Sequence, residues 1–185
     1  MASQRIGKYA CLEVECRYLL KSIPAELLDN PPGWLITDRY FPNTRLRLRH
    51  MKSLSGGEHI YKLTQKYRSE TQNPYETAIT NLYLTEAAYN HFEVLEAMVL
   101  KKRRYPYIVQ GHTFSIDVFE GRHQGLILAE LELENQLEAD NVVLPSFVLS
   151  DVTEDPFFTG GNLVTMTDEE FRQGLSQRIR DHENF

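Results

Sequence analysis

Charged residues occupy every second position in three separate stretches of the chain. The stretches are Glu13 to Arg17, Arg45 to Arg49 and Glu130 to Glu134. Because side chains of a β-strand alternate between its two faces, each stretch would place its charges on one face and its apolar residues on the other. One stretch is basic, one acidic and one mixed, which solvation of a strand face alone does not readily explain. Together they would supply cations for an anion and carboxylates for a metal ion, the groups that phosphoryl chemistry needs.

The acidic stretch suits a hard divalent cation. Glu130, Glu132 and Glu134 share one face of the expected strand, and Glu13 and Glu15 offer the same groups from another strand. Mg²⁺ and Mn²⁺ prefer carboxylate oxygens, and neighbouring carboxylates repel one another unless a cation lies between them. The alternative interpretation of each stretch taken alone is an ordinary sheet face exposed to water.

The basic stretch suits a phosphate, and two later expected strands reinforce it. The basic residues concerned are Arg45, Arg47, Arg49, Lys62, Lys66, Lys102 and Arg104. Like charges directly across a sheet destabilise it, so such strands make sense side by side mainly where an anion or carboxylates offset the repulsion. The arginine fork binds phosphate through two parallel hydrogen bonds, and lysine adds a point charge. The alternative is surface charge paired with the acidic strands.

Strand patterns recur along the chain and predict an antiparallel sheet. Expected strands run from Tyr9 to Leu20, Trp34 to Tyr40, Thr44 to Met51, Glu58 to Tyr67, Ala78 to Leu84, Val99 to Tyr107, Thr113 to Glu120 and Leu126 to Glu134. Short turns separate several of them. About eight strands with two or three helices predict an α+β fold whose sheet is strongly curved or closes into a barrel, since closure removes exposed edges.

Three helical segments are expected between and after these strands. Residues 22–29 predict a short helix, and Thr85 predicts an N-cap for a helix whose apolar positions continue to Leu95 and Met98. The segment from Thr167 to Glu170 has the form of a capping box that opens a C-terminal helix. Gly160 and Gly161 are expected to form only a turn, because no phosphate-loop signature follows them.

The composition predicts one globular domain. The chain has 185 residues, 42% of them apolar, and a net charge of -6, whereas nucleic-acid binders are usually basic overall. The two cysteines, Cys11 and Cys16, would lie on opposite faces of one strand, which favours a reduced protein. Neither a signal-peptide pattern nor an apolar run of membrane-spanning length is present. We therefore expect a soluble, cytoplasmic protein with neither a nucleic-acid nor a membrane partner.

Five segments resemble, in order, the signatures of the CYTH superfamily, the triphosphate tunnel metalloenzymes. Residues 13–17 resemble its ExExK signature, residues 46–49 its RxR strand and residues 61–66 its lysine strand. Residues 102–105 resemble its KxRY segment, and residues 117–121 with 129–134 resemble its late acidic hairpin. The resemblance spans roughly Glu13 to Leu163. It implies an eight-stranded antiparallel β-barrel with a few flanking helices, a single domain over residues 1–185, and a charged tunnel inside it.

The resemblance also implies roles for individual side chains. The expected phosphate ligands are Arg17, Arg47, Arg49, Lys62, Lys66, Lys102 and Arg104. The expected ligands of one or two Mg²⁺ or Mn²⁺ ions are Glu13, Glu15, Glu130 and Glu132, with Glu134 and Asp117 as weaker candidates. Lys66 and Glu132 are the catalytic candidates: Lys66 would assist proton transfer if neighbouring cations depress its pKa, and Glu132 would hold a metal that activates water.

Metal-dependent hydrolysis of inorganic tripolyphosphate or of a nucleoside triphosphate is the leading hypothesis. The alternatives are a class IV type adenylate cyclase and a noncatalytic phosphate- or polyphosphate-binding module. The chain departs from the family pattern where Arg17 replaces lysine. It also lacks a carboxylate between Ala78 and Leu84, where many relatives carry an acidic pair. The sequence leaves the oligomeric state open, with a homodimer as one alternative.

Overall fold

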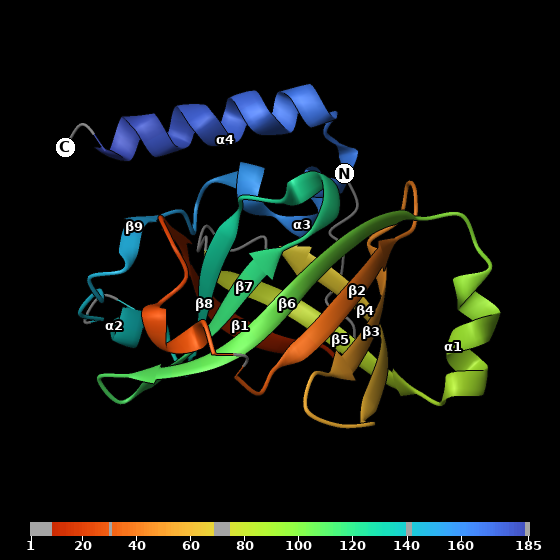
Figure 1. Ribbon diagram of the computed structural model, residues 1–185. Helices are drawn as coiled ribbons and strands as arrows, with labels where there is room; N and C mark the ends of the chain where they lie inside the picture. The colour runs from red at the N-terminus through yellow and green to blue at the C-terminus, as the bar shows by residue number, and fades with distance from the viewer. Residues whose placement is uncertain (1–8, 30, 69–74, 140–141, 184–185) are drawn as a thin grey trace.

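The protein is an antiparallel β-barrel in which eight strands form a closed ring (Figure 1). The computed structural model describes residues 9–29, 31–68, 75–139 and 142–183. The strands of the barrel are β1 (Cys11–Leu20), β2 (Trp34–Tyr40), β3 (Leu46–Ser53), β4 (His59–Arg68), β5 (Glu76–Leu84), β6 (Met98–Val109), β7 (His112–Phe119) and β8 (Ile127–Leu133). Their order is β5-β4-β3-β2-β6-β7-β8-β1, and a pairing of β1 with β5 closes the ring. The predicted eight-stranded barrel is therefore confirmed.

A ninth short strand, β9 (Val148–Asp151), pairs with the outer end of β1 and was not predicted. The 3₁₀ turn η1 (Ala25–Leu27) stands where the sequence predicted a longer helix over 22–29. Further short helical segments are η2 (Gly121–His123), α2 (Gln136–Ala139) and η3 (Pro156–Phe158). Gly160 and Gly161, expected to form a turn, instead begin the short helix α3 (Gly160–Thr165).

Helix α1 (Glu86–Glu93) begins as predicted and ends earlier. The hydroxyl of Thr85 accepts a hydrogen bond from the backbone N–H of Ala88, so the predicted N-cap is confirmed. The guanidinium of Arg39 donates to the backbone carbonyls of Glu93 and Leu95 at 2.8 and 3.0 Å, satisfying groups that a continuing helix would use. Met98 lies in β6, opposite Tyr40 of β2, and so does not belong to the helix.

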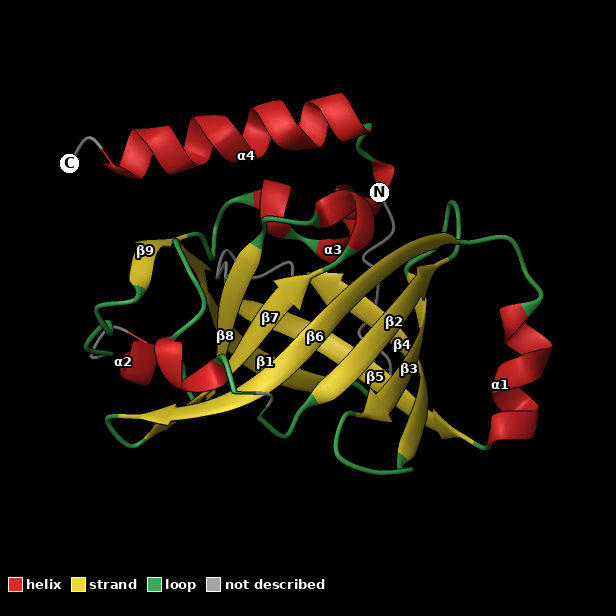
Figure 2. Ribbon diagram, viewed as in Figure 1, coloured by secondary structure: helices red, strands yellow, loops and turns green. Residues whose placement is uncertain are grey.

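Helix α4 (Asp168–Glu183) begins at the predicted capping box. The backbone N–H of Glu170 donates to the hydroxyl of Thr167, and the Glu170 carboxylate accepts from the backbone N–H of Thr167. Figure 2 shows α3 and α4 over one end of the barrel, with α1 beside it. Among the described residues, no helix combines the length and apolar character needed to cross a membrane.

Apolar residues close the end of the barrel beneath α3 and α4. One buried cluster joins strand residues to the helical cap: Leu19, Leu100, Phe119, Leu126, Leu128, Val152, Phe157, Phe158, Leu163, Val164, Phe171 and Leu175. A second cluster around Tyr18, Phe114 and Leu131 packs on the outer face of β1, β7 and β8. The barrel interior is thus apolar at the capped end, which leaves its middle for the charged residues.

Gly174 in α4 tests how tightly the cap packs. A Cβ atom at this position would lie 2.4 Å from Cε2 of Phe157, whereas a Cβ on Gly161 would meet nothing within 4 Å. We expect Gly174→Ala to lower the free energy of unfolding by about 1–3 kcal/mol, the usual effect of overpacking. Gly161→Ala, the matched helical control, should be neutral or raise it by up to about 1 kcal/mol. Urea denaturation measures both, and a stabilising Gly174→Ala would contradict this packing.

Candidate functional site

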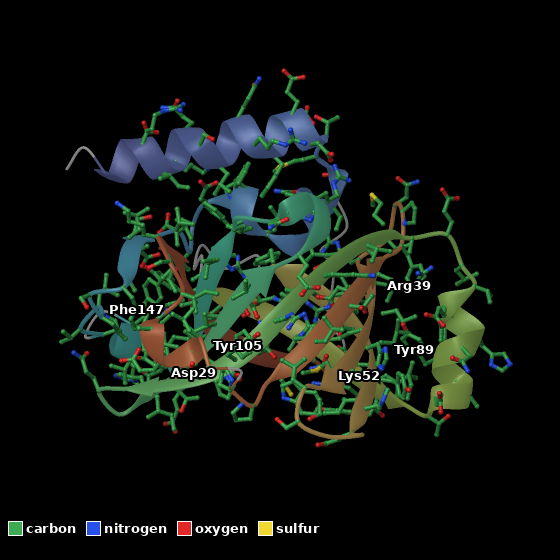
Figure 3. All side chains as sticks on the ribbon, viewed as in Figure 1. Asp29, Arg39, Lys52, Tyr89, Tyr105 and Phe147 are labelled. Carbon is green, nitrogen blue, oxygen red and sulfur yellow. The ribbon has the colours of Figure 1, made fainter. Side chains whose placement is uncertain are left out.

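A cavity of about 510 Å³ fills the middle of the barrel, and charged side chains line it. Figure 3 shows side chains tipped with nitrogen and oxygen gathered inside the ring of strands. The sequence-predicted residues that line the cavity are Glu13, Glu15, Arg17, Arg47, Arg49, Lys62, Lys66, Lys102, Arg104, Glu130 and Glu132. The barrel therefore brings together every residue that the sequence assigned to phosphate or to metal, apart from the two weaker candidates Asp117 and Glu134.

The wall formed by β3 and β4 carries the cations with the fewest carboxylate contacts. Within the described chain, Arg45 and Lys62 have no carboxylate partner; they lie 4.8 and 4.9 Å from the ring centres of Tyr67 and Tyr83. The Nε of Arg47 lies 3.6 Å from a carboxylate oxygen of Asp38, which is beyond hydrogen-bond range. These three cations are the most available to an incoming anion.

The wall formed by β1 and β8 carries the glutamates. Glu15 lies directly opposite Glu132, and Arg17 lies directly opposite Glu130, in the antiparallel register of the two strands. The guanidinium of Arg17 contacts both strands: Nη2 donates to Glu15 at 2.5 Å, and Nε lies 3.4 Å from Glu130. Glu132 is exposed to the cavity and has no ion pair within the described chain.

Lys66 lies between the two walls. Its ammonium is 3.6 Å from a carboxylate oxygen of Glu13 and 4.0 Å from one of Glu15. The sequence-based hypothesis for Lys66 supposed cationic neighbours, and the structure instead places carboxylates beside it. Lys66 therefore connects the cationic wall to the acidic one.

Two buried aspartates, which do not line the cavity, pair with the remaining cations. Asp38, which sequence reasoning missed, accepts hydrogen bonds from Nε and Nη2 of Arg49 at 2.6 and 2.7 Å. Asp117, a weaker metal candidate, accepts from Arg104 at 2.6 and 2.7 Å and also pairs with Lys102. Both aspartates are at most 1% exposed, and neither lines the cavity. The alternation of Trp34–Tyr40 gave a signal for Asp38: it is a lone carboxylate on a strand face that is otherwise formed by aromatic and aliphatic residues.

The structure also shows the consequence of the missing acidic pair and the position of Glu134. Strand β5 contributes only the neutral Thr77, Ile79 and Asn81 to the cavity lining, so the missing acidic pair leaves this wall uncharged. The hydroxyl of Thr64 donates to the Asn81 side-chain oxygen at 2.8 Å. Glu134 lies beyond the end of β8, exposed and outside the lining.

The protein is similar to an inorganic triphosphatase in part of its sequence and to another in its fold. No family model matches the chain. A curated inorganic triphosphatase of Acetivibrio thermocellus is 33% identical over 87 residues, which cover 44% of this chain and 53% of that protein. The chain thus spans about half the length of the curated relative that it matches.

A solved structure described as an inorganic triphosphatase aligns with a TM-score of 0.55 at 21% identity, covering 84% of this chain and 95% of that one. A second structure, described as a hypothetical protein, aligns with the same TM-score and identity over 83% and 98%. The chain therefore shares the fold of these two structures. Each of the five sequence segments that resemble the CYTH superfamily contributes charged residues to this one cavity.

Burial and neighbouring charges shift the pKa values of three groups in and around the cavity. Burial raises the pKa of Asp38, but the charges of Arg49 and Arg47 outweigh it, so the pKa lies well below the ordinary value. Burial also raises the pKa of Glu130. The charges of Lys102, Arg104 and Arg17 outweigh this effect and hold the pKa well below its usual range. For Lys102, burial is the larger effect, and its pKa is lowered despite Asp117. Asp38 and Glu130 are therefore ionised at neutral pH.

The acidic wall fits a divalent metal in the type of its donors. Glu15 and Glu132 face one another across two strands, an arrangement of like charges that a cation would stabilise. However, no three His, Cys, Asp or Glu side chains of the described chain are arranged to hold a metal ion. The reason is visible in the contacts: Arg17 engages Glu15 and Glu130, and Arg104 also engages Glu130.

The Asp38–Arg49 pair predicts a large and pH-dependent effect on stability. We expect Asp38→Asn to lower the free energy of unfolding by about 3–5 kcal/mol at pH 7, because a buried guanidinium is left uncompensated. The folded-state pKa of Asp38 is depressed, so its stabilisation is present above the ordinary carboxyl pKa near 4 and is lost as the pH falls below it. The difference between wild type and variant should therefore shrink from pH 7 to pH 3.

Denaturant unfolding at the two pH values measures this difference. Glu120→Gln is the matched control, because it removes a carboxylate that pairs with Arg103 at 2.6 Å on the surface. Surface pairs contribute at most about 1 kcal/mol. An Asp38→Asn effect as small as that of the control, or one independent of pH, would contradict the assignment.

Proposed function

We propose that the protein hydrolyses small molecules that contain a triphosphate, inorganic tripolyphosphate or a nucleoside triphosphate, within the barrel. One observation carries the proposal: available cations on β3 and β4 face glutamates on β1 and β8 across a single cavity. The inorganic triphosphatase relatives described above support it. The domain proposed for this activity is the single barrel with its cap.

The interior is positively charged in a protein that is acidic overall. Counting the buried Asp38 and Asp117, six carboxylates face eight cations: Arg17, Arg45, Arg47, Arg49, Lys62, Lys66, Lys102 and Arg104. The whole chain has a net charge of -6. A cavity with low-dielectric walls and an excess of positive charge concentrates anions, and a triphosphate carries enough negative charge to use it.

The two walls suggest separate tasks. Arg47, Lys62 and Arg45 would bind the phosphate chain and stabilise the charge that develops on its oxygens. They would lose the fewest carboxylate contacts on binding it. Arg49, Lys102 and Arg104 are already paired with the buried aspartates, so they would add positive potential and hold the wall in place. Phosphoryl transfer depends mainly on such positioning and electrostatic stabilisation.

The glutamates Glu13, Glu15, Glu130 and Glu132 would hold Mg²⁺ or Mn²⁺. Such an ion, when bound, supplies positive charge opposite the phosphates and activates water for attack. Lys66, within 4.0 Å of Glu13 and Glu15, is placed to orient groups between this wall and the phosphate chain, and is the candidate for proton transfer.

A binding module without turnover is the second candidate. The neutral lining of β5 and the arginine-occupied glutamates both favour it, because they leave fewer carboxylates for a metal than the acidic strands alone suggest. Such a protein would bind the same phosphate chain through the same cations.

A product assay distinguishes these functions. The protein is incubated with tripolyphosphate, ATP or thiamine triphosphate, with Mg²⁺ or Mn²⁺ and with EDTA in a parallel reaction. We expect orthophosphate release that requires the metal and stops with EDTA. Tight binding by calorimetry without any product would instead support the binding module, and cyclic AMP with pyrophosphate from ATP would support a cyclase.

Arg47 provides a test of the cationic wall. We expect Arg47→Gln to reduce kcat/KM for tripolyphosphate by about 10–100-fold, since a charge-assisted hydrogen bond contributes about 1.5–3 kcal/mol. Arg103→Gln is the matched control: Arg103 is a strand arginine on β6 that pairs with Glu120 outside the cavity, and its replacement should leave kcat/KM nearly unchanged. Equal kinetics of the two variants would remove Arg47 from the site.

A further inference from the structure

Arg17 occupies the place between the two acidic strands where a metal ion would be expected. Its Nη2 donates to Glu15 of β1 at 2.5 Å, and its Nε lies 3.4 Å from Glu130 of β8. Because Arg17 and Glu130 are directly opposite in the register, this guanidinium bridges carboxylates from both strands. It thereby supplies the positive charge that the facing Glu15 and Glu132 would otherwise need from a bound cation.

The bridge depends on arginine rather than on charge alone. A guanidinium is planar and presents donors in several directions, so one side chain can engage two carboxylates at once. A lysine ammonium is a compact point charge on a flexible stem and cannot hold the same two groups with fixed geometry. Three other cations of the described chain lie near these glutamates: Arg104, which pairs with Glu130, Lys102, whose charge also acts on Glu130, and Lys66, which lies 4.0 Å from Glu15.

One donor of the bridge is left unsatisfied. The Nε of Arg17 is buried and has no hydrogen-bond partner among the described residues, since its 3.4 Å contact with Glu130 is longer than a normal hydrogen bond. A buried donor without a partner is costly, and Arg17 lines the cavity in which an anion would bind. A phosphate oxygen could satisfy this donor, and in doing so would draw the guanidinium away from the glutamates.

We propose that Arg17 is an internal cation that competes with a divalent metal for Glu15 and Glu130, so that the metal binds tightly only after a phosphate chain has engaged Arg17. This inference rests on the proposed function, because it assumes that the cavity binds phosphate. It assigns an order to the two ligands: the anion binds first and the metal follows. By linkage, each ligand then favours the binding of the other.

Calorimetric titration of Mn²⁺ into the phosphate-free protein tests the competition directly. We expect weak binding to the wild type and binding about 10–100-fold tighter to Arg17→Gln, the range over which partners of metal ligands alter affinity. Arg17→Lys should fall between the two, because the charge stays while the bridge is lost. If Arg17→Gln does not fold, as judged by its thermal unfolding, Arg17→Lys carries the test alone.

Lys62→Gln is the matched control. It removes one positive charge from the same cavity, but Lys62 contacts Tyr83 and no carboxylate of the described chain. We expect its Mn²⁺ affinity to stay within about threefold of the wild type, the size of a screened long-range charge effect. If Lys62→Gln and Arg17→Gln tighten Mn²⁺ binding equally, or if the wild type already binds as tightly as Arg17→Gln, the proposal is overturned.

The product assay keeps the two proposals distinguishable. Hydrolysis by a protein whose phosphate-free form binds Mn²⁺ tightly would overturn the competition and leave the proposed function standing. Tighter Mn²⁺ binding by the Arg17 variants in a protein that releases no product would support the competition and overturn the proposed hydrolysis. Titration of tripolyphosphate in EDTA completes the test: wild type should bind it without metal, and absence of binding would contradict the proposed order.

Discussion

Burial of charge is the constraint on which the rest of this structure depends. A charge taken out of water must be paired or hydrogen-bonded, because its desolvation costs several kcal/mol. The barrel meets this requirement with two aspartates, Asp38 and Asp117, which are at most 1% exposed and hold Arg49, Arg104 and Lys102. These pairs allow the barrel to enclose a charged cavity and still fold.

The same pairing divides the cations by availability. Those held by the buried aspartates have fixed positions, whereas Arg45, Arg47 and Lys62 keep donors that an anion can use. On the opposite wall, Arg17 and Lys66 pair with Glu13, Glu15 and Glu130. The proposed binding of a phosphate chain would therefore exchange these partners rather than fill an empty site, which is why the ligands of the two walls are expected to depend on one another.

The apolar cap limits where this charge lies. Inner-facing positions of β1, β6, β7 and β8 are charged in the middle of each strand and apolar toward α3, where Phe158 and Leu163 pack against them. The approach is close: a Cβ on Gly160 would lie 1.9 Å from the hydroxyl of Tyr40. A strand pattern of period two shows which residues share a face. It does not show where along that face the charged cavity ends and the apolar core beneath the cap begins.

The sequence by itself determined the strands and which residues share each face. Trp34–Tyr40 was predicted to the residue, and the helix caps at Thr85 and Thr167 were predicted because these signals are local. The family resemblance predicted that the charged faces point inward, but only the tertiary structure decided that Asp38 meets Arg49 and that Arg17 bridges two strands. The physical reason is register: these partners come from strands far apart in the chain, and their alignment follows from closure of the barrel rather than from any local pattern.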